Sequence, residues 1–564
     1  MFFSIEFGLA FFAFFVAYWL CRANHRLQNL VLLIANYAIL LLLGNAFVAI
    51  VLACYTLFIY AASIAIAKSE SKAVFLAFVA LSICNLSFFK YYANFKDGFE
   101  SILTFFHLNI ANIDILMPLG LSFYTFASIT YLRSIYEAKR DKATLSYQAP
   151  SDASNINPTT QILPTSPSGV ADYVIEQNPK LQSLPNLAIY LSFFPTIIAG
   201  PIIRSDFFFS QLHATRFWRA KNAHLIIVLL CFGIVKKVLF ATYASSYSSP
   251  ILANPLNHNS LELALAMCGY SVEIYCDFSG YVDLVSAVAL MLGFVLPPNF
   301  NMPYMARNLK DFWARWHISL STFIRDFIYI PLGGSRCGFL RTQFALLVAF
   351  VLSGIWHGST INFMIWGLAH GLGIVWLNTL KHFSHNTYKS ITPNLTQQEK
   401  SIKTSTKSAS KTSTKSKTHQ KDSKDSTPKD FTSKDSLASQ PKQPSSYLFG
   451  SSAFGVFLSS FCTFAFVTIA WVFFRFRELD ESLGFLSAFW ENLSKPIYLS
   501  ETLIALCGLL LFALYPKLQN FKRSCIYTLY KVPPIAKPLV LAFVWLVAFC
   551  FMPDGIPNFI YANF

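Results

Sequence analysis

The chain has 564 residues, of which 54% are hydrophobic, 16% are aromatic and 13% are charged, whereas a soluble domain has roughly 25% charged residues. The formal net charge is +16, but the Lys and Arg residues lie between apolar runs and in one polar insert, which argues against a nucleic-acid-binding patch. The eleven cysteines include no CxxC pair, so neither a disulfide framework nor a metal site is indicated. The composition therefore excludes a soluble fold and predicts a membrane protein.

Apolar runs of about 17 to 25 residues, the length needed to cross a bilayer, recur from one end of the chain to the other. The first run, Phe2 to Leu20, has neither the basic start nor the cleavage pattern of a signal peptide, so it is predicted to be a retained span. Arg22 and Arg26 follow it and, by the positive-inside rule, place that end in the cytoplasm and the N-terminus outside. Basic residues recur between the next segments at Lys68, Lys72, Lys139, Arg140 and Lys142.

The composition along the chain predicts five regions. These are N-terminal transmembrane helices over 1–136, a flexible polar loop over 141–183, an apolar core over 187–380, a disordered Ser/Thr/Lys-rich insert over 381–447 and C-terminal transmembrane helices over 448–564. The insert contains 13 Lys against 5 Asp and Glu, which accounts for half of the net charge. Both polar regions are expected to lie in the cytoplasm.

Helix-breaking residues divide the first apolar run of the core. Pro195, Gly200 and Pro201 interrupt the stretch from Leu187 to Ile203, which is typical of a re-entrant segment or of an ordinary kinked span. Further spans are expected near His224 to Tyr243, Leu261 to Cys276, Val282 to Leu296, Phe344 to Trp356, Asn362 to Leu377, Phe454 to Phe474, Leu503 to Tyr515 and Leu539 to Phe551. The predicted fold is an all-α polytopic transmembrane protein with about 11 to 13 membrane segments, including re-entrant pieces.

Ionisable side chains concentrate between Tyr270 and His370. They are Glu273, Asp277, Asp283, Asp311, Arg315, His317, Arg325, Asp326, His357 and His370. A charged group at the centre of a bilayer costs at least about 2.5 kcal/mol, so each of them is a candidate functional residue. Asp311 and Arg315 stand four residues apart and are predicted to pair on one helix face.

Two of these residues are candidates for acid–base chemistry. His357, flanked by Trp356 and Gly358, interrupts two apolar runs, and His317 ends an aromatic segment. A histidine beside aromatic residues can act as a general base, because its unperturbed pKa of about 6.5 lies near neutral pH, and acyl transfer from a thioester to a hydroxyl needs such a base. The alternative is a structural histidine. No serine-hydrolase, phosphate-binding, HExxH or dinucleotide motif is present, which favours direct transfer with histidine as the base.

A set of sequence blocks lies in a characteristic order within residues 115–377. The blocks are Pro118-Leu-Gly-Leu-Ser-Phe-Tyr-Thr-Phe126, Phe193-Phe-Pro195 with Ala199-Gly-Pro-Ile202, Tyr275-Cys-Asp-Phe-Ser-Gly-Tyr281, Asp311 to Ser321, Arg325-Asp-Phe-Ile-Tyr-Ile-Pro-Leu-Gly-Gly334 and Ser353 to Gly358. Together with Trp471-Val-Phe-Phe-Arg475, they resemble the membrane-bound O-acyltransferase family, in particular its bacterial branch of alginate O-acetylation and teichoic acid D-alanyl transfer proteins. Cys276 departs from the Phe expected there, and the two polar regions look longer than the usual connections.

The resemblance implies a ring of helices around a central funnel whose thin floor holds a catalytic histidine. It implies that the core over 187–380 is catalytic, that His357 is that histidine, and that His317 is the second functional polar position. The residues expected to support them are Asp311, Arg315, Trp316, Trp356, Tyr275 and Asp277. No bound cofactor is expected, and the acyl donor would be the thioester of acetyl-CoA or of an acyl carrier protein.

The expected function is O-acetylation of a cell-envelope polysaccharide, either an alginate-like exopolysaccharide or peptidoglycan, by a multi-pass enzyme of the inner membrane. The acetyl group would pass directly or through a periplasmic partner acetyltransferase. The alternatives are D-alanyl transfer to teichoic acid, acylation of a protein or lipid, a structural scaffold, and a transporter or flippase of envelope precursors. Charges at the midplane and broken helices also occur in transporters, but no internal repeat is visible.

Overall fold

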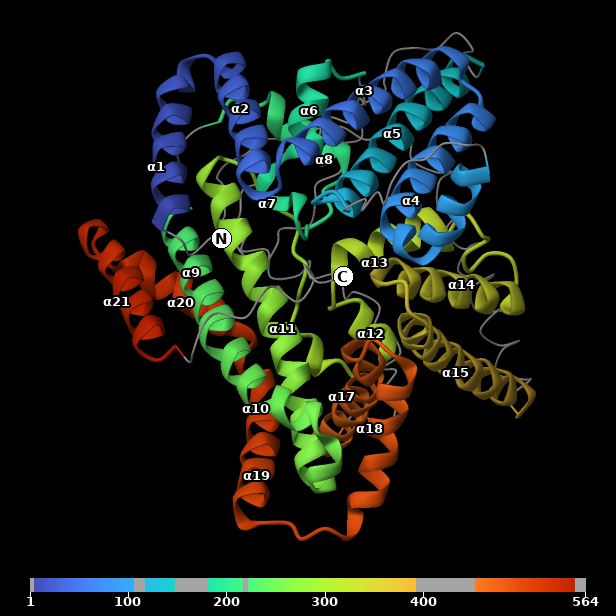
Figure 1. The fold of residues 1–564 in the computed structure, drawn as a ribbon, viewed down its shortest axis with the longest axis vertical. Coiled ribbons are helices and arrows are strands. Elements are labelled where there is room, and N and C mark those ends of the chain that lie inside the picture. The colour runs from blue at the N-terminus through green and yellow to red at the C-terminus, as the bar shows by residue number, and fades with distance from the viewer. Residues whose placement is uncertain (1–4, 106–116, 148–180, 217–221, 392–451, 553–564) are drawn as a thin grey trace, which may run out of the picture.

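The computed structural model describes residues 5–105, 117–147, 181–216, 222–391 and 452–552, and within these ranges every regular element is a helix (Figure 1). The α-helices are α1 Ile5–Leu20, α2 His25–Leu43, α3 Ala46–Ser69, α4 Lys72–Phe105, α5 Leu121–Tyr147, α6 Leu184–Ser192, α7 Phe194–Ile197, α8 Ser205–His213, α9 Ala223–Ile234, α10 Thr242–Ala253, α11 Ser260–Met291, α12 Leu309–Trp313, α13 Ile318–Ile324, α14 Phe339–His357, α15 Ile361–Ile391, α17 Ala453–Arg475, α18 Leu479–Glu491, α19 Leu499–Leu514, α20 Phe521–Lys531 and α21 Lys537–Cys550. Short 3₁₀ or π helices are η1 Cys21–Ala23, η3 Val235–Ala241, η4 Pro255–Asn257, η5 Pro303–Met305, η6 Arg325–Tyr329, η7 Asn492–Ser494, η8 Tyr515–Asn520 and η9 Pro534–Ala536.

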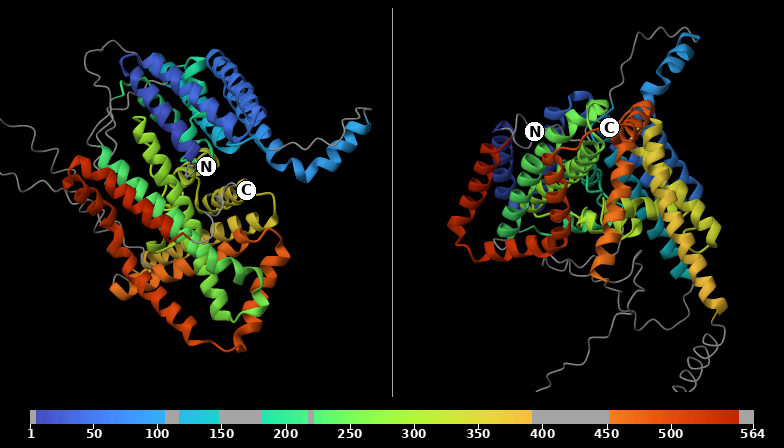
Figure 2. Two further views of the ribbon diagram at one scale, coloured as in Figure 1. Left: turned by 60° about the vertical axis from the view of Figure 1, so that its left-hand side comes forward. Right: turned by 90° about the horizontal axis from the view of Figure 1, so that it is seen from below.

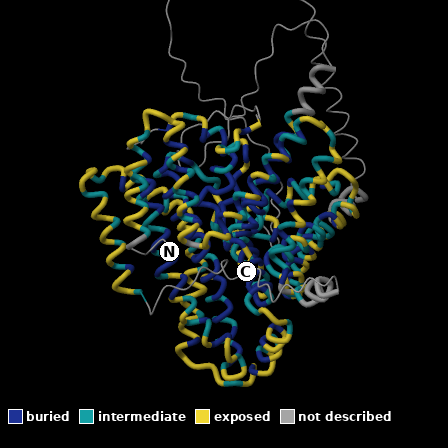
Figure 3. Tube along the Cα trace, turned by 45° about the horizontal axis from the view of Figure 1, so that its top comes forward, coloured by how far each residue is buried: buried dark blue, intermediate teal, exposed yellow. Residues whose placement is uncertain are grey.

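Helix α11 runs through the middle of the molecule. In Figure 1, α1 to α8 lie in the upper part of the view, α14 and α15 lie to the right of α11, and α17 to α19 flank its lower half. Both views in Figure 2 show α9 packed between α11 and α21, in agreement with the contacts among these three helices. The buried residues gather along the centre, whereas the outer helices carry the exposed positions (Figure 3). Helix α11 is therefore the element around which the other helices assemble.

The apolar surface of the outer helices indicates that these helices face membrane lipid. Among the described residues, nine helices are long and apolar enough to cross a membrane, and two shorter apolar helices cover Phe7–Ala23 and Pro534–Cys550. Large apolar side chains on α19 and α21, such as Leu511 and Phe543, are exposed, which is normal for a surface that faces acyl chains. The prediction of an all-α, multi-pass membrane protein is confirmed.

One helix replaces two predicted spans. Separate spans are predicted at Leu261 to Cys276 and at Val282 to Leu296, but α11 is continuous from Ser260 to Met291. Gly280 lies between the two predicted spans without breaking the helix, because α9 and η3 pack directly against it. A Cβ atom on Gly280 would lie 3.1 Å from the carbonyl oxygen of Gly233. Glycine at this position thus allows close helix packing.

The predicted interruption between Leu187 and Ile203 is confirmed. Helix α6 ends at Ser192, and the backbone of the next residue, Phe193, leaves the helical region with φ −56° and ψ 100°. Pro195 lies in the first turn of α7, where its missing N–H costs nothing, and Gly200 adopts a positive φ of 79° after that helix. Re-entry of this segment from one membrane face stays a prediction.

Two helices extend into the regions that were predicted to be polar and irregular. Helix α5 continues to Tyr147, and α15 continues to Ile391. Residues 148–180 and 392–447, which make up most of the predicted loop and insert, lie outside the described residues.

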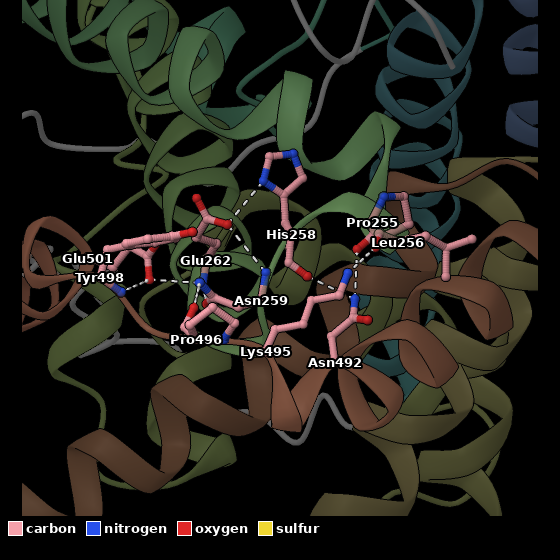
Figure 4. Close-up of polar contacts among 10 residues, drawn as sticks. All are labelled: Pro255, Leu256, His258, Asn259, Glu262, Asn492, Lys495, Pro496, Tyr498 and Glu501. Atoms are coloured by element: carbon pink, nitrogen blue, oxygen red, sulfur yellow. Dashed lines mark hydrogen bonds and ion pairs between the residues drawn. The ribbon is translucent and has the colours of Figure 1, made fainter.

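A polar network joins the start of α11 to the start of α19 (Figure 4). The Asn259 side chain accepts a hydrogen bond from the Glu262 amide at 3.0 Å and donates one to Glu501 Oε2 at 2.7 Å. Glu262 in turn accepts from the Asn259 amide at 3.3 Å and lies 3.1 Å from His258 Nδ1. This capping box satisfies the free amides at the helix start and also attaches the C-terminal helices to α11.

Two glycines set the contact between α14 and α15. A Cβ atom on Gly354 would lie 2.1 Å from the backbone oxygen of Phe363, and a Cβ atom on Gly367 would lie 2.3 Å from the backbone oxygen of Phe350. Real Cβ atoms do not approach backbone oxygens this closely, so these positions accept only glycine without separating the helices. The position of α14 matters because it ends at His357.

We expect Gly354→Ala to destabilise the protein by about 1 to 3 kcal/mol, because the added methyl group must push α15 away. This cost exceeds the gain of about 1 kcal/mol that alanine gives over glycine inside a helix. Gly484→Ala is the control, since nothing lies within 4 Å of a Cβ atom there. Thermal unfolding of the detergent-solubilised protein measures both variants, and a Gly354→Ala variant as stable as Gly484→Ala would contradict the expectation.

Candidate active site

The two candidate histidines come together around one tryptophan. His357 is the last residue of α14 and is 4% exposed, and His317 directly precedes α13 and is 1% exposed. The Trp356 ring centroid lies 4.7 Å from that of His357 and 6.5 Å from that of His317. The fold therefore places these three predicted site residues in a single cluster, in which both histidines are buried and Trp356 is partly buried.

The backbone at His317 adopts an unusual conformation. Its φ of 43° and ψ of 54° lie in the left-handed region, which is costly for a residue other than glycine and is frequent at functional sites. The segment is held by Asn299, whose backbone oxygen and side-chain oxygen accept from the amides of Ile318 and Ser319, each at 3.0 Å. The His317 ring packs edge-on against Phe278 of α11 at 4.9 Å. Asn299 thus holds the backbone next to His317, and Phe278 packs against the His317 ring.

Aromatic rings from two other helices enclose His357. Trp366 of α15 and Phe474 of α17 each lie 5.1 Å from its ring, measured between centroids. These contacts keep bulk water from the imidazole and so suit chemistry in which hydrolysis of a thioester must be avoided. Trp366 and Phe474 are not predicted as site residues, because both lie in apolar runs where an aromatic residue is common.

Helix α4 tethers the end of α14. Tyr91 Oη donates to the backbone oxygen of Ile355 at 2.6 Å, and Lys90 Nζ donates to that of His357 at 3.4 Å. Lys90 Nζ also lies 5.5 Å from the centroid of the Trp356 ring, within reach of a cation–π interaction. Lys90 was not identified from the sequence, although a lysine inside an apolar run is a signal that could have identified it.

The polar and aromatic residues before His317 brace the segment that carries it. Arg315 Nε lies 2.7 Å from Asp311 Oδ1, so the predicted pairing of these two residues is confirmed. Trp316 is 1% exposed and packs against Tyr275, with 6.3 Å between ring centroids. Four predicted supporting residues therefore lie beside the candidate site, while their functional roles stay predictions.

Two carboxylates of α11 are ion-paired with lysines. Asp277, a predicted supporting residue, pairs with Lys237 of the π-helix η3. Asp283 lies 2.7 Å from both Lys236 and Lys522. None of the three lysines was identified from the sequence. Since Asp277 and Asp283 each have a cationic partner, these buried charges are compensated and can serve to join η3, α11 and α20.

A small cavity lies close to the site. The described residues line a cavity of about 20 Å³, with Phe123, Ala127 and Ile202 among them, which is enough for one water molecule. Phe123 also contacts Trp356, with 6.1 Å between ring centroids. The central funnel implied by the resemblance stays a prediction.

Comparison with known proteins places this region in context. The sequence model of the MBOAT, membrane-bound O-acyltransferase family matches residues 102–391, just over half of the chain, and this range contains both histidines. The chain is 31% identical over 306 residues to the peptidoglycan O-acetyltransferase of Helicobacter pylori, covering 54% of each chain. It is 31% identical over 359 residues to the probable alginate O-acetylase of Pseudomonas aeruginosa, covering 62% of this chain and 61% of that one.

A third relative carries a different activity in its name. The chain is 31% identical over 198 residues to the teichoic acid D-alanyltransferase of Bacillus subtilis, covering 34% of this chain and 50% of that one. The chain thus spans less than two thirds of the length of each of these three relatives.

Proposed function

Because the chain belongs to the membrane-bound O-acyltransferase family, we propose that it O-acetylates a cell-envelope polysaccharide as a multi-pass enzyme of the inner membrane. The observation that carries the proposal is the cluster of the buried His357 and His317 with Trp356 inside the region that matches the family. The names of the Helicobacter and Pseudomonas relatives favour peptidoglycan or an alginate-like exopolysaccharide as the acceptor.

The proposed reaction uses His357 as the general base. Its imidazole takes the proton of the acceptor hydroxyl while the hydroxyl oxygen attacks the thioester carbonyl carbon. A new C–O bond forms, the C–S bond breaks, and the proton passes from His357 to the departing thiolate, so the products are an acetyl ester and a free thiol. His317 binds the thioester carbonyl or orients the acceptor, and a hydrogen bond to the carbonyl would stabilise the developing oxyanion.

The two substrates are proposed to arrive from opposite sides of the membrane. The donor is the cytoplasmic thioester of acetyl-CoA or of an acyl carrier protein, and the acceptor approaches from the outer side. The acetyl group then crosses while the carrier stays in the cytoplasm. The acceptor is the polysaccharide itself or a periplasmic acetyltransferase that passes the group on.

The rival functions have less support. D-alanyl transfer rests on a relative that matches only 34% of this chain. The function of a transporter or flippase has less support than acyl transfer. Membership of an acyltransferase family predicts a chemical reaction and not transport.

We expect membranes containing the full chain to transfer label from [¹⁴C]acetyl-CoA to envelope polysaccharide, and the label to be released by mild alkali, as an ester is. Membranes without the protein are the control. A parallel incubation with a D-alanyl carrier thioester tests the main rival. If no donor labels any envelope polymer above the control, the proposed function is wrong.

A further inference from the structure

Three arginines from different parts of the chain converge on one acidic residue. Asp326 accepts hydrogen bonds from the side chain of Arg204 and from Arg325 Nε, the latter at 2.7 Å. Arg133 Nη1 donates to the backbone oxygen of the same aspartate at 2.9 Å. Arg133 belongs to α5, Arg204 precedes α8, and Arg325 begins η6. We refer to Arg133, Arg204 and Arg325 as the arginine cluster.

The arginine cluster keeps hydrogen-bond donors free for a ligand. The side chains of Arg204 and Arg325 are 51% and 58% exposed, and each guanidinium has five N–H groups, of which one carboxylate can occupy only some. Burial alone would raise the pKa of the Asp326 carboxyl, but the hydrogen bonds from Arg325 and Arg204 outweigh this effect and hold its pKa below the ordinary value. Asp326 therefore stays ionised at neutral pH and orients both arginines.

Other acidic groups face the arginine cluster as well. Glu137 Oε1 lies 2.7 Å from Arg133 Nε, and the carboxylate of Asp206 is close enough to Arg204 to interact with it electrostatically. The local charges of the cluster are thus nearly balanced. A ligand would be recognised by the planar, fixed N–H donors of the exposed guanidinium groups, an arrangement that suits the oxygens of a phosphate, rather than by excess positive charge.

A continuous helical segment connects the arginine cluster to the candidate active site. Helix α13 begins directly after His317 and runs into η6, which begins at Arg325. Arg325 lies eight positions after His317 along this segment, which corresponds to about 12 Å of helix. The cluster therefore lies within reach of the histidines for a ligand with an extended arm.

A row of aromatic rings also extends from the arginine cluster to the candidate active site. The Arg133 guanidinium lies 4.9 Å from the centroid of the Phe327 ring. From there the centroid distances are 4.5 Å from Phe327 to Phe323, 4.4 Å from Phe323 to Phe126 and 5.4 Å from Phe126 to Trp356. Trp356 contacts both histidines, so the aromatic row ends at the proposed site of chemistry.

The arginine cluster lies toward the side where the proposed donor arrives. The Phe75 ring stacks on Tyr136 at 4.9 Å, which places the start of α4 beside the part of α5 that holds Arg133. Lys68 and Lys72 flank the start of α4, and the positive-inside rule assigns this end to the cytoplasm.

We propose that Arg204 and Arg325 bind the phosphate of a phosphopantetheine thioester, whose pantetheine arm follows the aromatic row and delivers its acyl group to His357. This proposal rests on the proposed function and deepens it by assigning the donor site. Acetyl-CoA and the prosthetic group of an acyl carrier protein share this phosphate on pantetheine.

The test measures equilibrium binding of three donors, each labelled in the acetyl group, to the full-length protein in detergent. The donors are acetyl-CoA, acetyl-4′-phosphopantetheine and acetyl-pantetheine, of which the last has no phosphate. We expect Arg204→Gln and Arg325→Gln each to weaken binding of the first two about tenfold and to leave binding of acetyl-pantetheine unchanged. Arg22→Gln, an exposed arginine next to the first span, is expected to bind all three donors as the wild type does.

The comparison among donors separates the possible results. Equal wild-type affinity for acetyl-CoA and acetyl-4′-phosphopantetheine supports recognition of the single phosphate that a carrier protein also offers, whereas tighter binding of acetyl-CoA supports additional contacts to its other phosphates. Variants that bind all three donors like the wild type, or that lose all three equally, would overturn the inference. Wild-type protein that binds the phosphorylated donors and acetylates no polymer would refute the proposed function and leave this site intact.

Discussion

His357→Ala is expected to reduce acetyl transfer to envelope polysaccharide at least about a hundredfold, because a positioned general base contributes roughly 10²- to 10⁴-fold to such a reaction. The substitution removes the imidazole that Trp356, Trp366 and Phe474 enclose. The measurement is transfer of label from acetyl-CoA in membranes that contain equal amounts of wild-type and variant protein.

A second histidine supplies the matched control for this experiment. His258 lies at the start of α11, where its Nδ1 is 3.1 Å from Glu262, and it contacts none of the aromatic rings around His357. His258→Ala should therefore transfer acetyl at close to the wild-type rate. If His357→Ala retained normal transfer at normal abundance, another group would have to be the base.

Lys237→Met is expected to lower the free energy of unfolding by about 3 kcal/mol or more, because it leaves the Asp277 carboxylate buried without its ion-pair partner. Asp277 is only 1% exposed, and its partner comes from the neighbouring η3. Thermal unfolding in detergent and protein abundance in the membrane both report the loss.

Two further variants show whether this loss comes from the buried charge. Lys237→Met combined with Asp277→Leu removes both charges and should recover much of the stability. Lys522→Met should cost less than Lys237→Met, since Asp283 keeps Lys236 at 2.7 Å. A double variant no more stable than Lys237→Met would show that the pair is not the source of the effect.

The all-α membrane fold could be predicted from the sequence because the length of an apolar run is a local property. The pairing of Asp311 with Arg315 could also be predicted, because four residues of helix bring them together. Helix α11 was wrongly predicted as two spans. Lys237 and Lys236 neutralise Asp277 and Asp283 of this helix from an adjacent element, and pairing over such a separation is not visible in sequence.

The composition of the candidate site was only partly predictable. Trp356 and His357 are neighbours in the chain, so one motif contains both. Trp366 and Phe474 reach His357 from α15 and α17, and their convergence depends on how three helices pack. Helices α14 and α15 can pack this closely because Gly354 and Gly367 have no side chains. A glycine in an apolar run, however, does not indicate which helix packs against it.

The ion pairs of α11 also bear on how the chain enters the bilayer during synthesis. Lys237 precedes Asp277 by 40 residues and Lys236 precedes Asp283 by 47 residues, so each acidic residue emerges from the ribosome after its partner. Asp277 and Asp283 can therefore enter the lipid already paired with their lysines, which avoids the cost of inserting isolated charges. Lys522 follows Asp283 by 239 residues and joins a carboxylate that is already neutralised, so the core of the protein can be inserted before its last helices exist.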